Sequence, residues 1–291
     1  MAHSPSSYYV PHATRWPIIG SVGLTIMVIG FVNYLHDGGL GLYVLAGGLA
    51  VLLVMVFGWF GEVIRESQAG MNSEQMDRSY RWGMGWFIFS EVMFFAAFFG
   101  ALYYARVFSV PGLAGAHNNV MTHAILWPDF EAVWPLLQLP DAESFKVARG
   151  VVPAWGVPAL NTAILLTSGV TLTIAHWGLL KKNRPQLIIF LAATVALGAL
   201  FMYYQVLEYG EAISHLDLTM QSGIYGSTFY MLTGFHGAHV TLGAIMLTVI
   251  LIRAIRGHFA GHNHFAFEAA AWYWHFVDVV WLLLFVFVYW V

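Results

Sequence analysis

Residues 270–291 read AAWYWHFVDVVWLLLFVFVYWV, and Asp278 is the one formally charged side chain among them. A helix needs about 20 mostly apolar residues to cross roughly 30 Å of hydrocarbon. The run meets both conditions of length and composition. It therefore predicts a transmembrane helix.

Six further stretches meet the same conditions. They lie near residues 17–35, 41–61, 82–107, 158–180, 187–208 and 225–252. The composition agrees, because 59% of the 291 residues are apolar and only 9% are charged, against about a quarter in an ordinary soluble domain. The sequence predicts an all-α membrane protein with seven transmembrane helices, and it excludes a soluble globular domain or a disordered chain.

The side-chain inventory excludes several functions. The chain has no cysteine, so it has no thiolate metal site and no thiol nucleophile. Its net charge of -3 gives no overall basic field for nucleic acid. All three lysines, Lys146, Lys181 and Lys182, fall outside the predicted spans, so a retinal Schiff base cannot form within them. The bilayer is the first expected partner.

Basic residues are distributed unevenly about the predicted spans. If the N-terminus is inside, Arg106, Lys146 and Arg149 are the only three of the 12 basic residues that lie outside. This asymmetry fits the positive-inside rule. We expect the N-terminus inside and the C-terminus outside, with Glu208 among the acidic residues of the outer side. The N-terminal tail shows no cleavable signal and no transit peptide, so the first span should stay in the mature chain.

Composition shifts divide the chain into segments. We expect an N-terminal tail with the first two helices over 1–61, a polar inner linker over 62–81, and the remaining five helices over 82–291. The outer segment 108–157 mixes Pro, Gly and Trp, and it predicts an ordered loop with a short helix.

Glu91 lies in the stretch FIFSEVMFF of the third span. At about 1.5 Å per residue from Trp82, it sits roughly 13 Å into the helix, near the bilayer midplane. A carboxylate at that depth is costly, so Glu91 should be neutral, paired or turned toward protein. Two interpretations stay open: a functional carboxyl, or a protonated acid that forms a structural hydrogen bond between helices.

Four more polar residues lie within the spans. His236 and His239 are three residues apart in TGFHGAHV, and His275 and Asp278 have the same spacing in the last span. One helix supplies only part of a metal or haem coordination shell. We therefore interpret all four as structural residues that hydrogen-bond within the membrane.

Arginines lie at the inner ends of two spans, Arg65 in WFGEVIRES and Arg253 at the end of the sixth span. Together with Trp59 and Glu62 they suit a lipid phosphate, which accepts bidentate hydrogen bonds from a guanidinium. The alternative is that these arginines only set the topology. The inner loop HFAGHNHFAFE contains His258, His262 and His264. Metal binding there stays open as an alternative, but we interpret these histidines as solvated and predict no metal site.

The stretch HNHFAFEAAAWYWHFVDVVWLLLFVFVYW resembles the C-terminal signature of subunit III of the haem-copper cytochrome c oxidases. The resemblance continues upstream, in the family's order, through YGSTFYMLTGFHGAHV, VPALNTAILLTSGVTLTIAHW, FIFSEVMFFAAFFGALY and WFGEVIRES. It covers nearly the whole chain. The N-terminal tail and the 108–157 loop depart from the family pattern.

The resemblance implies a seven-helix subunit that contains no haem or copper and packs against the catalytic subunit I, with subunit II in the same complex. Its first two helices and its last five would form a V-shaped cleft filled with phospholipid. The whole enzyme would transfer electrons from cytochrome c to oxygen and pump protons. This subunit would support proton uptake and protect subunit I during turnover.

The resemblance also assigns residues. Glu91 matches the buried carboxyl that carbodiimides modify. Trp59, Glu62, Arg65 and Arg253 match positions in the lipid cleft, and His258 matches a position near the headgroups.

Two rival functions stay open. A quinol oxidase subunit III shares the last five helices but typically lacks the first two. A proton-coupled transporter could use Glu91 as a carrier, although no broken helix or inverted repeat is readable. The sequence favours the plasma membrane of a bacterium over a mitochondrial inner membrane.

Overall fold

The structure is a computed structural model that describes residues 14–36, 38–141, 146–259 and 264–290. The predictions for the first 13 residues of the tail, for 142–145 in the outer loop, for His262 and for the last residue fall outside this description.

The described residues form long helices joined by short segments. These helices are α1 (Trp16–Leu35), α2 (Gly41–Gln68), α3 (Glu74–Tyr104), α6 (Val157–Leu180), α7 (Arg184–Leu216), α8 (Gly223–Ile255) and α9 (Phe265–Leu284). Short elements continue α3 and α9, namely η1 (Ala105–Ser109), α4 (Val110–Leu113) and η2 (Phe285–Trp290), while α5 (Val120–Leu126) stands in the outer loop. Seven of these stretches are long and apolar enough to cross a membrane. The predicted all-α class with seven spans is confirmed.

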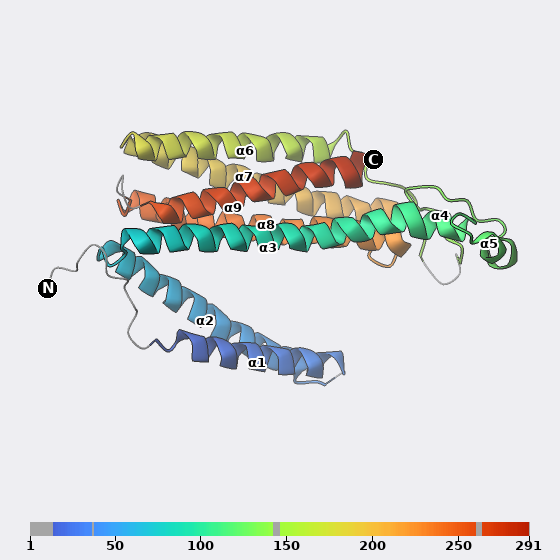
Figure 1. Cartoon of the computed structure of the whole chain (residues 1–291), viewed down its shortest axis with the longest axis horizontal. Helices are drawn as coiled ribbons and strands as arrows, with labels where there is room; N and C mark the ends of the chain where they lie inside the picture. The colour runs from blue at the N-terminus through green and yellow to red at the C-terminus, as the bar shows by residue number, and fades with distance from the viewer. Residues whose placement is uncertain (1–13, 37, 142–145, 260–263, 291) are drawn as a thin grey trace. The chain divides into compact units, whose positions relative to one another are not determined.

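The chain divides into two compact units, Met1–Trp82 and Gly83–Val291. In the first unit, α1 and α2 lie side by side (Figure 1). Their backbones approach closely, because a Cβ on Gly30 would lie 2.2 Å from the backbone nitrogen of Leu45. A Cβ on Gly48 would lie 2.4 Å from the backbone nitrogen of Met27. Glycine at both positions permits this contact.

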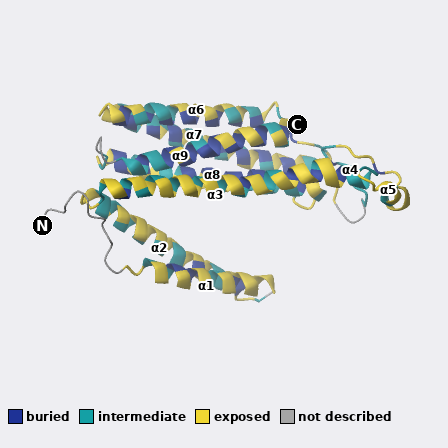
Figure 2. Ribbon diagram, viewed as in Figure 1, coloured by how far each residue is buried: buried dark blue, intermediate teal, exposed yellow. Residues whose placement is uncertain are grey.

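In the second unit, the core lies among α6, α7, α8 and α9. Figure 2 shows buried residues along these four helices and mostly exposed residues along α1, α2 and α3. Trp274 and Trp281 of α9 are the largest side chains that are almost completely buried. The last span is 56% buried, more than any other span. It therefore occupies the centre of this bundle.

The predicted inner linker 62–81 is mostly helical. Helix α2 continues to Gln68 and α3 begins at Glu74. Ser73 explains the start of α3, since its Oγ accepts a hydrogen bond from the backbone nitrogen of Met76 at 3.3 Å, as a helix N-cap does. An ion pair between Asp77 and Arg81 at 2.7 Å stabilises the first turns.

Helix α7 extends beyond the predicted span 187–208. Asn183 caps its first turn by accepting a hydrogen bond from the backbone nitrogen of Gln186 at 3.2 Å. The helix ends where Asp217 adopts a left-handed backbone with φ 49°. Glu208 therefore lies inside the helix and is only 3% exposed. Apolar periodicity marks the apolar run but does not show how far a helix continues past it.

The outer segment after α3 packs on itself. Val110, Phe130 and Leu136 form a small separate core. Arg106 lies over the ring of Trp134, with its guanidinium carbon 5.4 Å from the ring centroid. These contacts give the described part of the segment a defined structure.

Candidate functional site

Glu91 of α3 meets His239 of α8. The Oε2 of Glu91 lies 2.9 Å from the Nε2 of His239. The two side chains are 22% and 12% exposed, so both are largely removed from solvent. The Nδ1 of His239 lies 2.6 Å from the carbonyl oxygen of Phe235, one helical turn earlier.

These contacts fix the protons of the pair. A carbonyl oxygen only accepts hydrogen bonds, so Nδ1 of His239 must carry a proton. One further proton then lies between Nε2 and Oε2. The pair is either a neutral imidazole with a protonated acid or an imidazolium with a carboxylate, and it is electrically neutral in both forms. Neutrality is what a polar pair inside hydrocarbon requires.

Aromatic rings surround the pair. The ring centroid of His239 lies 4.9 Å from the ring centroid of Phe95. The ring of His239 also stacks on the ring of Tyr273, with 6.4 Å between the two centroids. The ring centroid of Phe94 lies 5.7 Å from that of His239 and 5.0 Å from that of Phe235. The hydrogen bond between α3 and α8 therefore lies in an apolar setting, where its loss would be costly.

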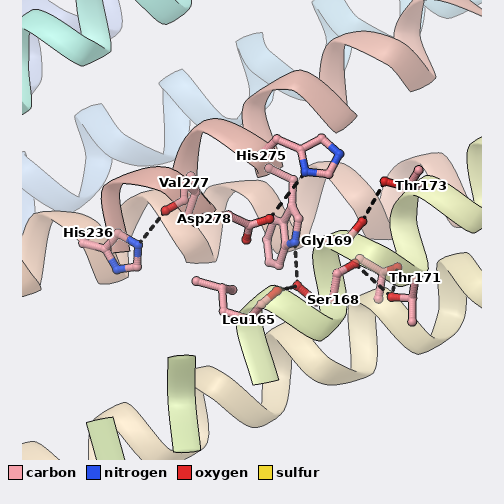
Figure 3. Close-up of polar contacts among 11 residues, drawn as sticks. Leu165, Ser168, Gly169, Thr171, Thr173, His236, His275, Val277 and Asp278 are labelled. Carbon is pink, nitrogen blue, oxygen red and sulfur yellow. Dashed lines mark hydrogen bonds and ion pairs between the residues drawn. The ribbon is translucent and has the colours of Figure 1, made fainter. Parts of the chain in front are cut away.

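His236 lies on the same helix and is 1% exposed. Figure 3 shows its Nε2 directed at the carbonyl oxygen of Val277 on α9, 3.2 Å away. Its ring packs against those of Phe201 and Trp281, at 5.8 and 5.1 Å. The side chain thus joins α8 to α9.

His275 and Asp278 lie on α9 opposite Gly169 of α6 (Figure 3). The Nδ1 of His275 is 3.5 Å from Oδ2 of Asp278, whose side chain is nearly buried. A Cβ on Gly169 would lie 2.5 Å from this Oδ2. Glycine at this position makes room for the carboxyl group against α6.

The predicted lipid residues fall in both units. In the first unit, Trp59 is half exposed and Arg65 is exposed. Glu62 accepts a hydrogen bond from the indole nitrogen of Trp16 on α1. The carboxyl group of Glu62 thereby ties α2 to α1, a contact that helical spacing within α2 does not reveal.

In the second unit, Arg253 and His258 lie at the end of α8. The backbone nitrogen of His258 bonds to the carbonyl oxygen of Arg253 at 3.0 Å. Arg253 is 8% exposed, and its guanidinium lies 4.7 Å from the ring centroid of Phe259. Its Nε is buried and makes no hydrogen bond to any described residue. This buried donor is left unsatisfied among the described residues.

Sequence reasoning missed a cluster around Glu208. The hydroxyl of Tyr289 donates to Oε1 of Glu208 at 2.6 Å, and Nε2 of Gln205 donates to the same oxygen at 3.2 Å. The sequence does show three polar residues near the ends of two predicted spans, Gln205 and Glu208 in one and Tyr289 in the other. All three lie within the predicted spans, and only the packing of α7 against η2 brings them together.

Sequence reasoning also missed a group formed by His176 of α6 with His264 and Glu268 at the start of α9. One nitrogen or oxygen from each lies within 4.8 Å of the others. His264 and Glu268 are four residues apart, which is a readable spacing. His176 is distant in sequence, so no local pattern includes it.

The sequence matches one protein family over nearly its whole length. The family model described as cytochrome c oxidase subunit III matches residues 6–137 and 118–291. Cytochrome c oxidase subunit 3 of Formosania lacustris is 40% identical over 291 residues, which cover 100% of this chain and 99% of the relative. The proteins of the same name from Danio rerio and Squalus acanthias show the same identity and coverage.

Proposed function

Because the chain belongs to the cytochrome c oxidase subunit III family, we propose that it supports proton uptake by the catalytic subunit I and protects that subunit during turnover. Membership makes the chain a subunit of an oxidoreductase complex. Its seven candidate spans make it a multi-pass membrane protein. The role in proton uptake, the contact with subunits I and II, and the bound lipid are the parts proposed here.

His236 and His239 do not suit haem or copper. Both ring nitrogens of His239 and the Nε2 of His236 are engaged in hydrogen bonds. His236 is also enclosed by aromatic rings, which leaves no space for a macrocycle. We assign the haems and copper of the complex to partner subunits.

The Glu91–His239 pair carries the proposal. It holds one shared proton within the membrane and fixes α3 against α8. Exposed apolar side chains flank Glu91 on α3, namely Phe89, Val92 and Met93. Such a face is suited to another membrane protein or to lipid tails. We propose that subunit I covers part of it and that the pair keeps α3 in place during turnover.

Lipid binding is proposed at the inner headgroup level. The guanidinium groups of Arg253, at the end of α8, and of the exposed Arg65 are the proposed donors to a phosphate. Half-exposed Trp59 suits the interface between headgroups and acyl chains. Glu62 and His258 complete the proposed lipid-binding set.

The orientation is also a proposal. Nine of 12 basic residues fall on one side of the spans, which favours the N-terminus inside and the C-terminus outside. We propose the plasma membrane of a bacterium as the compartment, with cytochrome c as the electron donor to the whole complex. Added cytochrome c should reduce the haems of the purified complex directly, whereas a quinol oxidase would require a quinol.

The complex purified with and without this chain tests the main proposal. Both preparations should reduce oxygen in the first turnovers, because the redox centres lie elsewhere. The preparation that lacks the chain should take up protons more slowly in steady turnover and lose activity sooner. Adding the chain back is the control. Equal proton uptake and equal working life would contradict the proposal.

A further inference from the structure

The group formed by His176, His264 and Glu268 is used neither in the Glu91–His239 pair nor in the proposed lipid contacts. His176 lies near the end of α6, which ends at Leu180. His264 is the N-cap of α9, and Glu268 lies in the first turn of that helix. We propose that these three side chains bind one divalent transition-metal ion, with zinc as the best match.

The distances fit ligands that share one ion. Nε2 of His264 lies 3.0 Å from Oε1 of Glu268, and Nε2 of His176 lies 3.8 Å from the same oxygen. All three donor atoms lie within 4.8 Å of one another. Two ligands on a tetrahedral zinc, each about 2.0–2.1 Å from the metal, are about 3.3 Å apart. The two short separations lie on either side of this value.

His176 supplies the observation that a hydrogen-bonded pair alone does not explain. Its Nε2 is buried and has no hydrogen-bond partner among the described residues. At 3.8 Å, its distance from Glu268 is too long for a hydrogen bond. A buried nitrogen directed at a carboxylate without a bond is costly. A metal ion between the two groups would give this nitrogen a partner.

The ligand types favour zinc over magnesium or calcium. Two imidazole nitrogens and one carboxylate oxygen form a His₂Glu set, which zinc uses with a fourth position open to water. Magnesium and calcium prefer sites built from oxygen ligands alone. Two neutral histidines and one carboxylate carry one negative charge, which attracts a dication.

The site is largely formed by the fold. The backbone nitrogens of Phe267 and Glu268 bond to the carbonyl oxygen of His264 at 2.9 and 3.2 Å, which fixes the first turn of α9. The ring of His176 packs 5.3 Å from that of Phe267. His176 keeps 30% of its side-chain surface exposed, so an ion can enter. A bound ion would cross-link the end of α6 to the start of α9.

Zinc binding by the detergent-purified complex tests this inference. The complex is first treated with a chelator and then titrated with zinc in a metal buffer, and zinc is counted per haem by elemental analysis. His176→Phe removes one ligand but keeps a ring against Phe267 and leaves the His264–Glu268 hydrogen bond in place. Glu268→Gln removes the carboxylate. Each variant should weaken one zinc site by more than about 10-fold, since even an outer-shell change costs that much.

The control is His215→Gln, which removes an exposed histidine in the last turn of α7 and should leave zinc binding unchanged. The haem spectrum and the amount of this chain in the complex verify assembly of each variant. Zinc X-ray absorption of the wild-type complex should show two imidazole nitrogens on one zinc. Equal zinc affinity in the wild type and His176→Phe, or a coordination shell without imidazole, would overturn the inference.

Discussion

The indole Nε1 of Trp274 on α9 donates a hydrogen bond to Oγ of Ser168 on α6 across 2.8 Å. The same ring lies against the backbones of two other helices. A Cβ on Gly198 of α7 would lie 2.7 Å from it, and a Cβ on Gly243 of α8 would lie 2.8 Å from it. One buried side chain thus connects α9 to three neighbouring helices.

Ser168→Ala should destabilise this bundle. The change leaves the indole N–H of Trp274 buried without an acceptor, at a typical cost of about 1–3 kcal/mol. Thermal unfolding of the purified complex measures the loss. Ser214→Ala is the matched control, because Ser214 is exposed and bonds only to the carbonyl oxygen of Gly210 within its own helix, at 2.7 Å. Equal stability of the two variants would remove Ser168 from this role.

Gly243→Ala should overpack the core beside Trp274. The added methyl group would lie 2.8 and 3.0 Å from two ring carbons, and a fully buried indole has little room to move. Overpacking of this kind typically costs about 1–3 kcal/mol. Gly237→Ala on the same helix is the control, because its Cβ would meet Met202 at an ordinary 3.9 Å. We expect a lower unfolding temperature for Gly243→Ala alone.

The number and order of the spans could be predicted because hydrocarbon imposes a length and a composition on each helix. The ends of the helices could not. Ser73 and Asn183 begin α3 and α7 through side-chain hydrogen bonds, which extend helices into polar sequence. Glu208 shows the consequence, since the residue that ends the predicted span 187–208 lies well inside α7 and is buried.

The candidate sites were predictable in part. The depth of Glu91 follows from counting residues, and it indicates that the carboxyl group needs a partner. The partner itself does not follow, because Glu91 and His239 are 148 residues apart and only tertiary packing joins them. The same limit applies to His176, which meets the start of α9 across a long stretch of chain.

Tyr289→Phe should weaken the contact of η2 with α7. The change removes the hydroxyl that donates to Glu208 at 2.6 Å and leaves Gln205 as the donor to that oxygen. We expect a loss of about 1–3 kcal/mol, because a buried carboxyl group loses a hydrogen bond. Tyr203→Phe removes an exposed hydroxyl from the same helix as Glu208 and should be neutral. Similar unfolding temperatures for both variants would contradict the expectation.

Replacing Arg65 and Arg253 together with alanine should reduce the phospholipid retained by the purified complex. Each guanidinium can donate charge-assisted hydrogen bonds to a phosphate. The working life of the enzyme during turnover should shorten as lipid is lost. Phosphorus analysis of the complex measures the retained lipid.

Lys181→Ala is the control for the arginine variant, because it removes an exposed positive charge at the end of α6. Lipid content should change only in the double arginine variant. If the double variant kept its lipid, both arginines would be topology determinants only.

Glu91→Gln and Glu91→Ala should have different effects. The Nδ1–H of His239 is bound to the carbonyl oxygen of Phe235, so in the neutral imidazole Nε2 is a hydrogen-bond acceptor. The amide of a glutamine at position 91 can donate to that nitrogen and preserve the contact between α3 and α8. An alanine leaves Nε2 buried without a partner, at a typical cost of about 1–3 kcal/mol.

The Gln variant should therefore assemble normally and keep most oxygen reduction, whereas the Ala variant should release this chain more readily from the complex on detergent washing. Subunit content after washing and the initial rate of oxygen consumption measure the two effects. Glu211→Gln, at an exposed position of α7, is the control and should behave as wild type. A fully assembled Glu91→Gln complex that reduces no oxygen would show that proton exchange at this carboxyl is obligatory, and a purely structural role for the pair would be wrong.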